Sequence, residues 1–180
     1  MTKRLEELIR LFFSDPKELG TFSHVQSTEV PEPYRHLLAH EHHMTVTVEA
    51  FHRSLVDVKV LEKNVSENHY ARRILLVRQD NQEVVQWGIM RIDLSQVAEE
   101  VAERIRAEET PLGRILIEHN VLRSIHLLNL WQVEPGPELN EWFENCPNPV
   151  YGRTAIIECN HQPAIELIEI VTPGSTVLNL

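Results

Sequence analysis

The segment Tyr70–Leu94, YARRILLVRQDNQEVVQWGIMRIDL, decides the fold class of this 180-residue chain. Its first half is rich in β-branched and other apolar residues from Arg73 onward, and its second half is another long apolar run. The polar tripeptide DNQ (80–82) between them is a turn signal. Two such runs joined by a short polar turn predict an antiparallel hairpin over residues 70–94.

Further strands are expected on both sides of this hairpin. Residues 55–64, LVDVKVLEKN, alternate valines with charged residues at a period of two. Residues 151–174, YGRTAIIECNHQPAIELIEIVTPG, predict a last hairpin that turns through 160–163. The intervening segment 114–136 is expected to begin with a short helix and end in a strand, before a loop at Pro135-Gly136-Pro137.

Helical spacing appears in three places. Apolar residues at positions 5–13 form one face of a helix that Ser14-Asp15-Pro16 ends. A second helix is expected from about Tyr34 to Met44, and the next ten residues fit a helix or a strand. Residues 95–109 predict an amphipathic helix with Ser95 as its N-cap. Residues 1–180 therefore predict one α+β domain, an antiparallel sheet with helices packed on it.

The composition narrows the class of partner. Hydrophobic residues make up 42% of the chain, and the formal net charge is −10, which repels nucleic acid and anionic membranes. The N-terminal segment lacks the apolar core of a signal peptide, and no apolar run approaches the roughly 20 residues that span a bilayer. The two cysteines, Cys146 and Cys159, have no metal-binding spacing. We expect a soluble, cytoplasmic protein that binds neither nucleic acid nor membrane.

Two arginines and two glutamates fall at informative strand positions. Arg72 and Arg73 are adjacent, so they point to opposite faces, and a core-facing arginine needs an anion or carboxylate partner. The alternative is that both are solvated at the entrance of the strand. Glu166 and Glu169 are three residues apart in an apolar strand, so one of them faces the buried side unless a bulge or edge position keeps both in water.

Three other stretches carry weaker signals. HEHHM at 40–44 invites a metal hypothesis, but it lacks the HExxH order, so a polar helix end is the simpler interpretation and Met44 is either core or cavity wall. In ETPLGRILIEHN (109–120), a turn is followed at once by Arg114, which fits a helix stop or the wall of a pocket for an anion. Gly152-Arg153 stands where a strand begins. No nucleotide-binding loop, zinc-finger spacing or nucleophile motif is present.

Five blocks together resemble the chorismate lyase family, and most closely its branch of unknown function. They are LLAHEHHMT, YARRILL, TPLGRILIEHN, YGRTAII and AIELIEIVTP, in the family's order over about residues 34–174. The resemblance implies an antiparallel sheet of about six strands, with helices on one side and helical flaps over an internal ligand cavity. It also implies that chorismate is split into pyruvate and 4-hydroxybenzoate without a cofactor or a metal, on the way to a quinone or another aromatic product.

The resemblance also implies a set of site residues. Arg72 would bind a substrate carboxylate, and Glu169 would lie near the oxygen that becomes the phenol. Arg72 and Glu169 are expected to act in catalysis, with Glu166 as the alternative to Glu169. Met44 and Leu112 would complete the binding site. The Gly-Arg pair that the family has in the strand after the hairpin turn is absent, because Ile89 follows Gly88. Arg91, two positions further along on the same strand face, is the candidate for the second arginine of the binding site, and whether it replaces that arginine stays open.

Two alternatives remain open at this stage. The same fold is similar to the ligand-sensing domains of bacterial transcription regulators, which would make the chain a small-acid-binding module without catalysis. Only about thirty residues precede the resemblance, too few for a helix-turn-helix, so such a regulator would need a separate partner. A related lyase that gives 3-hydroxybenzoate is the second alternative.

Overall fold

The computed structural model describes residues 1–66 and 69–174, and within these residues seven strands form one antiparallel sheet. Their order across the sheet is β1-β5-β6-β7-β4-β3-β2, and every neighbouring pair is antiparallel. The strands are β1 (Gly20–Val25), β2 (Val56–Val65), β3 (His69–Arg78), β4 (Val84–Asp93), β5 (Arg123–Pro135), β6 (Val150–Cys159) and β7 (Gln162–Val171). Two three-stranded meanders, β2-β3-β4 and β5-β6-β7, therefore meet through the β4–β7 pairing.

The α+β class and the antiparallel sheet are as the sequence predicts, with one more strand than the expected six. The hairpin over 70–94 is β3 and β4, and the last hairpin is β6 and β7, which turns at Asn160 and His161. The additional strand is β1, which lies between the two N-terminal helices that the sequence predicts, where no strand was expected. Its apolar anchor is Phe22, whose ring meets Trp131 of β5 edge-on at 6.2 Å between centroids.

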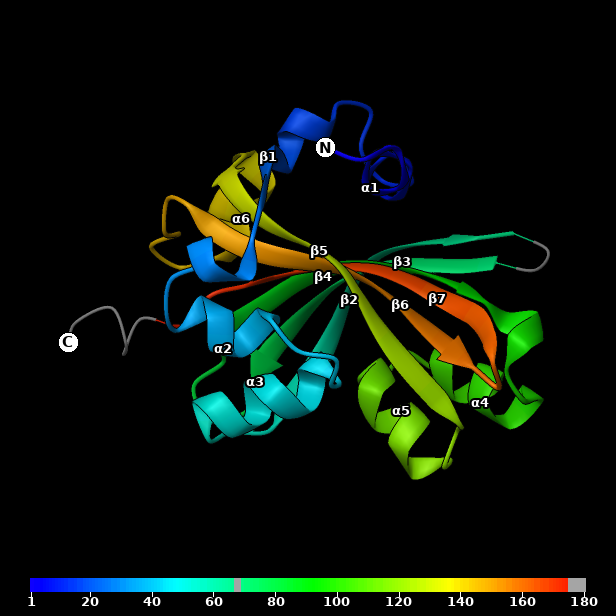
Figure 1. Ribbon diagram of the computed structural model, residues 1–180. Helices are drawn as coiled ribbons and strands as arrows, with labels where there is room; N and C mark the ends of the chain where they lie inside the picture. Colours follow the sequence, from blue (N-terminus) through cyan, green and yellow to red (C-terminus); the bar gives the residue numbers. More distant parts are fainter. Residues whose placement is uncertain (67–68, 175–180) are drawn as a thin grey trace.

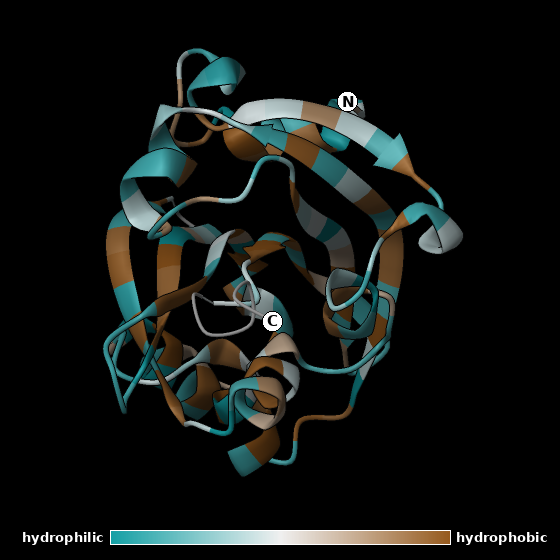
Figure 2. Cartoon of the chain, turned by 90° about the vertical axis from the view of Figure 1, so that its left-hand side faces the viewer, coloured by the Kyte–Doolittle hydropathy of each residue, from teal (hydrophilic) through white to brown (hydrophobic). Residues whose placement is uncertain are grey.

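Six α-helices are present among the described residues. They are α1 (Lys3–Ile9), α2 (Tyr34–Leu38), α3 (Met44–His52), α4 (Glu99–Arg106), α5 (Leu112–Glu118) and α6 (Pro137–Trp142). Figure 1 shows α2, α3, α4 and α5 on one side of the sheet, as expected, while α1 and α6 lie on the other. Figure 2 shows both hydrophobic and hydrophilic residues along the curved strands. Buried apolar residues lie on both faces of the sheet.

Two hydrophobic clusters fill the two sides of the sheet. The inner cluster lies under α2–α5 and includes Met44, Ile74, Met90, Leu112 and Leu167. The outer cluster lies under α1 and α6, and includes Leu8, Trp87, Trp131, Leu139 and Ile168. Most strand residues join the two clusters by alternation, which β-bulges such as the register shift between Leu76 and Val77 interrupt.

Several helix boundaries differ from the sequence-based expectation. The single helix predicted from Tyr34 to Met44 is wrong, because α2 ends at Leu38 and α3 begins at Met44, with a loop between them. The ambiguous segment after Met44 is helical. Ser95 is not the N-cap of α4; it lies in a 3-10 turn, where its N–H donates to the Asp93 side chain over 3.0 Å.

The remaining boundary corrections concern Pro-Gly turns. The Pro-Leu-Gly turn does not only stop the preceding helix, because Leu112 and Gly113 are the first residues of α5. The segment 135–137, predicted as a loop, leads into α6 with Pro137 in its first turn. Proline is tolerated there since the first N–H groups of a helix have no intrahelical partner.

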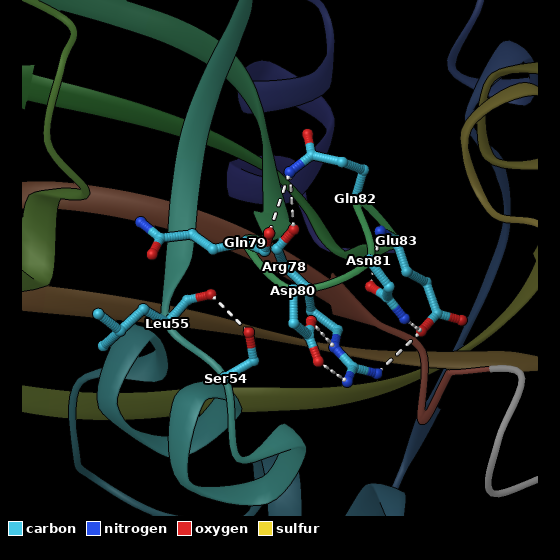
Figure 3. A network of polar contacts seen from close by, with 8 residues as sticks. All are labelled: Ser54, Leu55, Arg78, Gln79, Asp80, Asn81, Gln82 and Glu83. Atoms are coloured by element: carbon cyan, nitrogen blue, oxygen red, sulfur yellow. Dashed lines mark hydrogen bonds and ion pairs between the residues drawn. The ribbon is translucent and has the colours of Figure 1, made fainter.

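The turn between β3 and β4 is held by its own polar side chains (Figure 3). Arg78 pairs with Asp80 at 2.6 Å and with Glu83 at 3.1 Å. The Gln82 amide donates to the carbonyl oxygens of Arg78 and Gln79 at 3.3 and 3.4 Å, and Gln82 itself has a positive φ of 62°. The predicted turn at 80–82 is confirmed, and these contacts fix the register of the hairpin that carries Arg72.

No helix among the described residues is both long enough and apolar enough to cross a bilayer.

Candidate functional site

A cavity lies between the inner face of the sheet and the first turns of α3 and α5. Its floor comes from β3, β4 and β7, with Arg72, Gln86, Met90, Leu167 and Glu169 among its lining residues. Its roof comes from His43–Thr45 and Pro111–Gly113. The four positions Met44, Arg72, Leu112 and Glu169, which the sequence assigned to one site, therefore do line one cavity.

The cavity is small in this conformation. Its volume is about 30 Å³, and a buried site needs roughly 10–15 Å³ for one water molecule. A six-membered ring does not fit in that space. Binding of a ring-sized ligand therefore requires the roof to move away from the floor, or side chains of the lining to rearrange.

Arg72 is a fully buried cation on the cavity floor, with a relative exposure of 0%. It stands opposite Met90 in the β3–β4 pairing, and its Nε donates to the Met90 sulfur at 3.4 Å. Neither Nη1 nor Nη2 makes a hydrogen bond of normal geometry among the described residues, although the Tyr70 hydroxyl lies close enough to interact with the guanidinium. Burial lowers the pKa of Arg72, an effect that Tyr70 and Glu108 oppose, yet a guanidinium stays charged in proteins. Two free parallel donors on a buried cation suit a carboxylate.

The acidic group whose charge acts on Arg72, Glu108, is engaged by other residues. Glu108 accepts from the Tyr70 hydroxyl at 2.8 Å and from Lys63 at 2.9 Å. Burial and the hydrogen bond to Glu108 raise the pKa of Tyr70 to about 12, so its hydroxyl remains protonated. Sequence reasoning missed Tyr70 and Glu108. Because Glu108 is bonded to Tyr70 and Lys63, it neutralises the charge of Arg72 only in part.

Arg73 emerges on the opposite face, as the alternation predicts. It pairs with Glu138 of α6 at 3.1 Å and with Glu62 of β2 at 3.2 Å, and its guanidinium lies 5.0 Å from the Phe13 ring centroid. The interpretation of both arginines as solvated is therefore wrong, because one lines the cavity and the other is bound on the outer face.

Glu169 and Glu166 are separated in the same way. Glu169 lines the cavity, and its Oε2 accepts from Arg153 Nε at 2.8 Å while its Oε1 accepts from Gln86 Nε2 at 3.3 Å. Glu166 lies on the outer face, where it pairs with Arg91 and with Arg4 of α1. Glu169, and not Glu166, is thus the glutamate of this site.

Arg91 does not reach the cavity, so its candidate assignment as the second arginine of the binding site is wrong. It is adjacent to Met90, whose side chain faces the cavity, and a one-residue step along a strand reverses the face. Its partner is Glu166, directly opposite it on β7.

The second arginine of the cavity is Arg153, which sequence reasoning noted only as part of a weak Gly-Arg signal. It is 1% exposed and stands opposite Glu169 in the β6–β7 pairing. Besides its bond to Glu169, Nη1 donates to the His40 carbonyl at 2.8 Å and Nη2 to the His42 carbonyl at 3.1 Å. Arg153 thus ties the carboxylate of the site to the loop between α2 and α3.

His43 closes the roof as a neutral histidine. Arg123 Nε donates to His43 Nε2, so the ring proton is on Nδ1. Burial, followed by the charges of Arg123 and Arg153, lowers the pKa of His43 to about 4. The Nδ1 side lies against Gly113, where an added Cβ would be 3.3 Å from this nitrogen.

The roof depends on the close approach of α3 and α5. A Cβ on Gly113 would lie 3.1 Å from Thr45 Oγ1 and 3.2 Å from the His43 Cβ, so glycine permits this contact. Arg114 forms an ion pair with Glu49 of α3. The arginine after the Pro-Leu-Gly turn therefore anchors α5 to α3, while the turn itself forms cavity wall.

The histidine-rich stretch does not form a metal site in the described part of the chain. No group of three or more His, Cys, Asp or Glu side chains with metal-binding geometry occurs in residues 1–66 and 69–174. His40 and His42 stack with ring centroids 5.6 Å apart, and the loop that holds them is bound to Arg153 through its carbonyl oxygens. These histidines shape the roof.

Comparison with known proteins gives a limited result. No protein-family model matches the sequence, and no curated protein matches it. Among solved structures, a possible transcriptional regulator, YydK from Bacillus subtilis, superposes with a TM-score of 0.42 at 14% identity. The superposition covers 65% of this chain and 58% of that chain, so it takes in little more than half of the regulator's length. A similarity of this size assigns no function.

Replacing Gly113 with valine should force α3 and α5 apart. The new side chain would press on Thr45 and His43, and overpacking of this kind costs about 1–3 kcal/mol. We expect chemical denaturation to show a loss of stability of that size. Ala50→Val, at an exposed position of the neighbouring helix α3, is the matched control and should change stability by no more than about 0.5 kcal/mol. Equal effects of the two variants would contradict a tightly closed roof.

The roof histidines should make stability depend on pH. Burial lowers the pKa values of His40 and His43 from the ordinary 6.5 to about 4, so between these values the unfolded chain binds protons that the folded chain does not. Stability is then complete above about pH 6.5 and falls as the pH drops toward 4, at no more than about 1.4 kcal/mol per pH unit for each proton. Urea denaturation from pH 7.5 to 4.5 should show a shallower slope for His43→Gln. An unchanged slope in His43→Gln would contradict the argument.

Proposed function

We propose that this protein is a chorismate lyase, which eliminates pyruvate from chorismate to give 4-hydroxybenzoate. The observation that carries the proposal is the pair of unpartnered guanidinium nitrogens of Arg72 on the floor of a closed cavity. A buried cation with two free donors is stabilised by a ligand carboxylate, and the residues around it are mostly apolar, which suits a ring. The resemblance of five sequence blocks to the chorismate lyase family supplies the candidate ligand.

The spacing of Arg72 and Glu169 supports a ligand that is acidic at one end and carries a hydroxyl at the other. In the strand register, Arg72 stands level with Leu167, two strands away, and Glu169 is two residues further along β7. The two backbones are then about 10 Å apart across the sheet and about 7 Å apart along it. Both side chains reach into the same cavity, so a single six-membered ring can span the distance that is left.

The reaction would require little from the protein beyond positioning. The ring carbon that carries the hydroxyl loses its proton, the neighbouring C–O bond breaks, and the ring becomes aromatic. The enolpyruvate that leaves takes up a proton on carbon and becomes pyruvate. Arg72 would hold the ring carboxylate, and Glu169, the carboxylate among the cavity-lining residues, would assist the proton transfer. Met44 and Leu112 would supply apolar walls that exclude water.

A coupled assay for pyruvate tests the proposal directly. Purified protein mixed with chorismate should release pyruvate and an equal amount of 4-hydroxybenzoate, identified by chromatography, and the rate should persist in the presence of a chelator. Release of neither product would refute the lyase assignment. Formation of 3-hydroxybenzoate in place of the 4-isomer would keep the reaction class and change the product.

Arg72→Ala should lower kcat/KM by about a hundredfold or more, because it removes the group that holds the carboxylate in the transition state. Arg91→Ala is the matched control, since it removes an arginine from the same sheet on the opposite face. Its activity should be within about twofold of the wild type. Similar losses in both variants would show that the cavity is not where the reaction occurs.

The pairing of Glu169 favours a second candidate, a module that binds a small acid without converting it. Both carboxylate oxygens of Glu169 already accept hydrogen bonds, from Arg153 and Gln86. Two of the lone pairs that a substrate hydroxyl would need are therefore already occupied. Saturable binding of 4-hydroxybenzoate or chorismate, measured by calorimetry, without any pyruvate release would favour this candidate over the lyase.

A further inference from the structure

Gln86 is a polar residue in the apolar strand β4, and nothing in the sequence marked it. It is 2% exposed and lines the cavity on the same face as Glu169, because Gln86 and Gly88 are two residues apart and Gly88 stands opposite Glu169. Its Nε2 donates to Glu169 Oε1 at 3.3 Å. Its Oε1 is buried and has no hydrogen-bond partner among the residues that the structure describes.

The orientation of this amide follows from its neighbour. Glu169 is bonded to the Arg153 guanidinium, and an ionised carboxylate only accepts hydrogen bonds. The Gln86 NH₂ group must therefore face Glu169, and a flipped amide would set two acceptors against each other. The carbonyl oxygen is left as a buried acceptor without a partner on a residue that lines the cavity, and such an acceptor costs about 1–3 kcal/mol.

The two ends of the cavity thus have opposite hydrogen-bonding character. Arg72 offers two free donors at one end. Gln86 is four residues along β4 from Met90, the residue that faces Arg72, which is about 13 Å of strand. Both side chains extend inward and close part of that distance.

We propose that Gln86 is a specificity-determining residue, which accepts a hydrogen bond from an O–H group at the end of the ligand remote from the carboxylate held by Arg72. The inference rests on the proposed function, in that it takes the ligand of this cavity to be a small ring acid. It adds that the acid must be a hydroxy acid. An acid without the hydroxyl would leave the Gln86 oxygen unpaired and bind less tightly. An ether oxygen at that place would also bind less tightly, because it has no proton to donate to the Gln86 oxygen.

A double-mutant cycle between protein and ligand tests this role. Calorimetry would measure the dissociation constants of 4-hydroxybenzoate and benzoate for the wild type and for Gln86→Met, which keeps the length of the side chain and removes the amide. The wild type should bind 4-hydroxybenzoate about tenfold more tightly than benzoate, the value of one net hydrogen bond. In Gln86→Met this preference should fall by about fivefold or more, because benzoate binding changes little.

Two further variants make the result specific. Arg72→Gln should weaken both acids in parallel and leave their ratio as in the wild type, because it acts on the carboxylate. Gln86→Asn keeps the amide on a shorter side chain, so it should reduce the preference and provides the test if Gln86→Met does not fold. Far-UV circular dichroism and thermal unfolding would confirm the fold of each variant.

The outcomes separate this inference from the function on which it rests. Binding of both acids to wild type and Gln86 variants with the same ratio would overturn the role of Gln86 and leave an acid-binding cavity in place. Equal weakening of both acids in Gln86→Met would also overturn it, since the residue would then only support the cavity. Binding of neither acid to the wild type would overturn both proposals together.

Discussion

The ion pair between Arg153 and Glu169 is the contact on which the arrangement of the cavity depends. Both side chains are buried, and a buried charge is costly unless it is paired and hydrogen-bonded. Arg153 meets this condition with Glu169 and with two carbonyl oxygens of the loop before α3. One guanidinium therefore orients the carboxylate on the floor and positions the segment that leads into the roof. Removing either partner would leave an isolated buried charge and release that loop.

The sheet keeps this charge system apart from a second one. On the inner face, Arg72, Gln86, Arg153 and Glu169 meet at the cavity, whereas on the outer face Arg73, Arg91 and Glu166 bind groups on α1, α6 and the sheet itself. The separation follows from the alternation of side chains along β3, β4 and β7 at these positions. It keeps the buried Arg72 apart from the acidic groups of the outer face, in a chain whose net charge is −10. Glu108 and Glu169, the acidic groups around the cavity, are bonded to other residues, so neither forms an ion pair with Arg72.

Alternation also explains how much could be predicted from the sequence. It predicted the two hairpins, the split between Arg72 and Arg73 and the burial of one glutamate of the last strand. The family resemblance then selected four residues that do share one cavity. The same rule explains why Arg91 does not line the cavity: it is adjacent to Met90, whose side chain faces the cavity, so Arg91 points to the opposite face. Gln86 could have been found as the polar position on the apolar cavity face of β4.

The errors have a common physical origin in long-range contacts. The predicted helix from Tyr34 to Met44 is broken where loop carbonyls bind Arg153, a residue more than a hundred positions away, and no local signal records that. Strand β1 is held by its pairing with β5 and by the packing of Phe22 against Trp131, and its own six residues do not record these long-range contacts. The sequence did not show that the Pro-Leu-Gly turn lines the cavity, because that placement depends on the ion pair between Arg114 and Glu49.

That last contact has a consequence for how long a ligand stays bound. Glu49 also accepts the backbone N–H of Val56 at 3.1 Å, so one carboxylate links α3, α5 and the start of β2. On the function proposed above, a ring-sized ligand would pass only when these segments separate, and the ion pair between Arg114 and Glu49 would oppose that separation. Residence time would then depend on this opening as well as on affinity, and added salt would shorten it by weakening the ion pair.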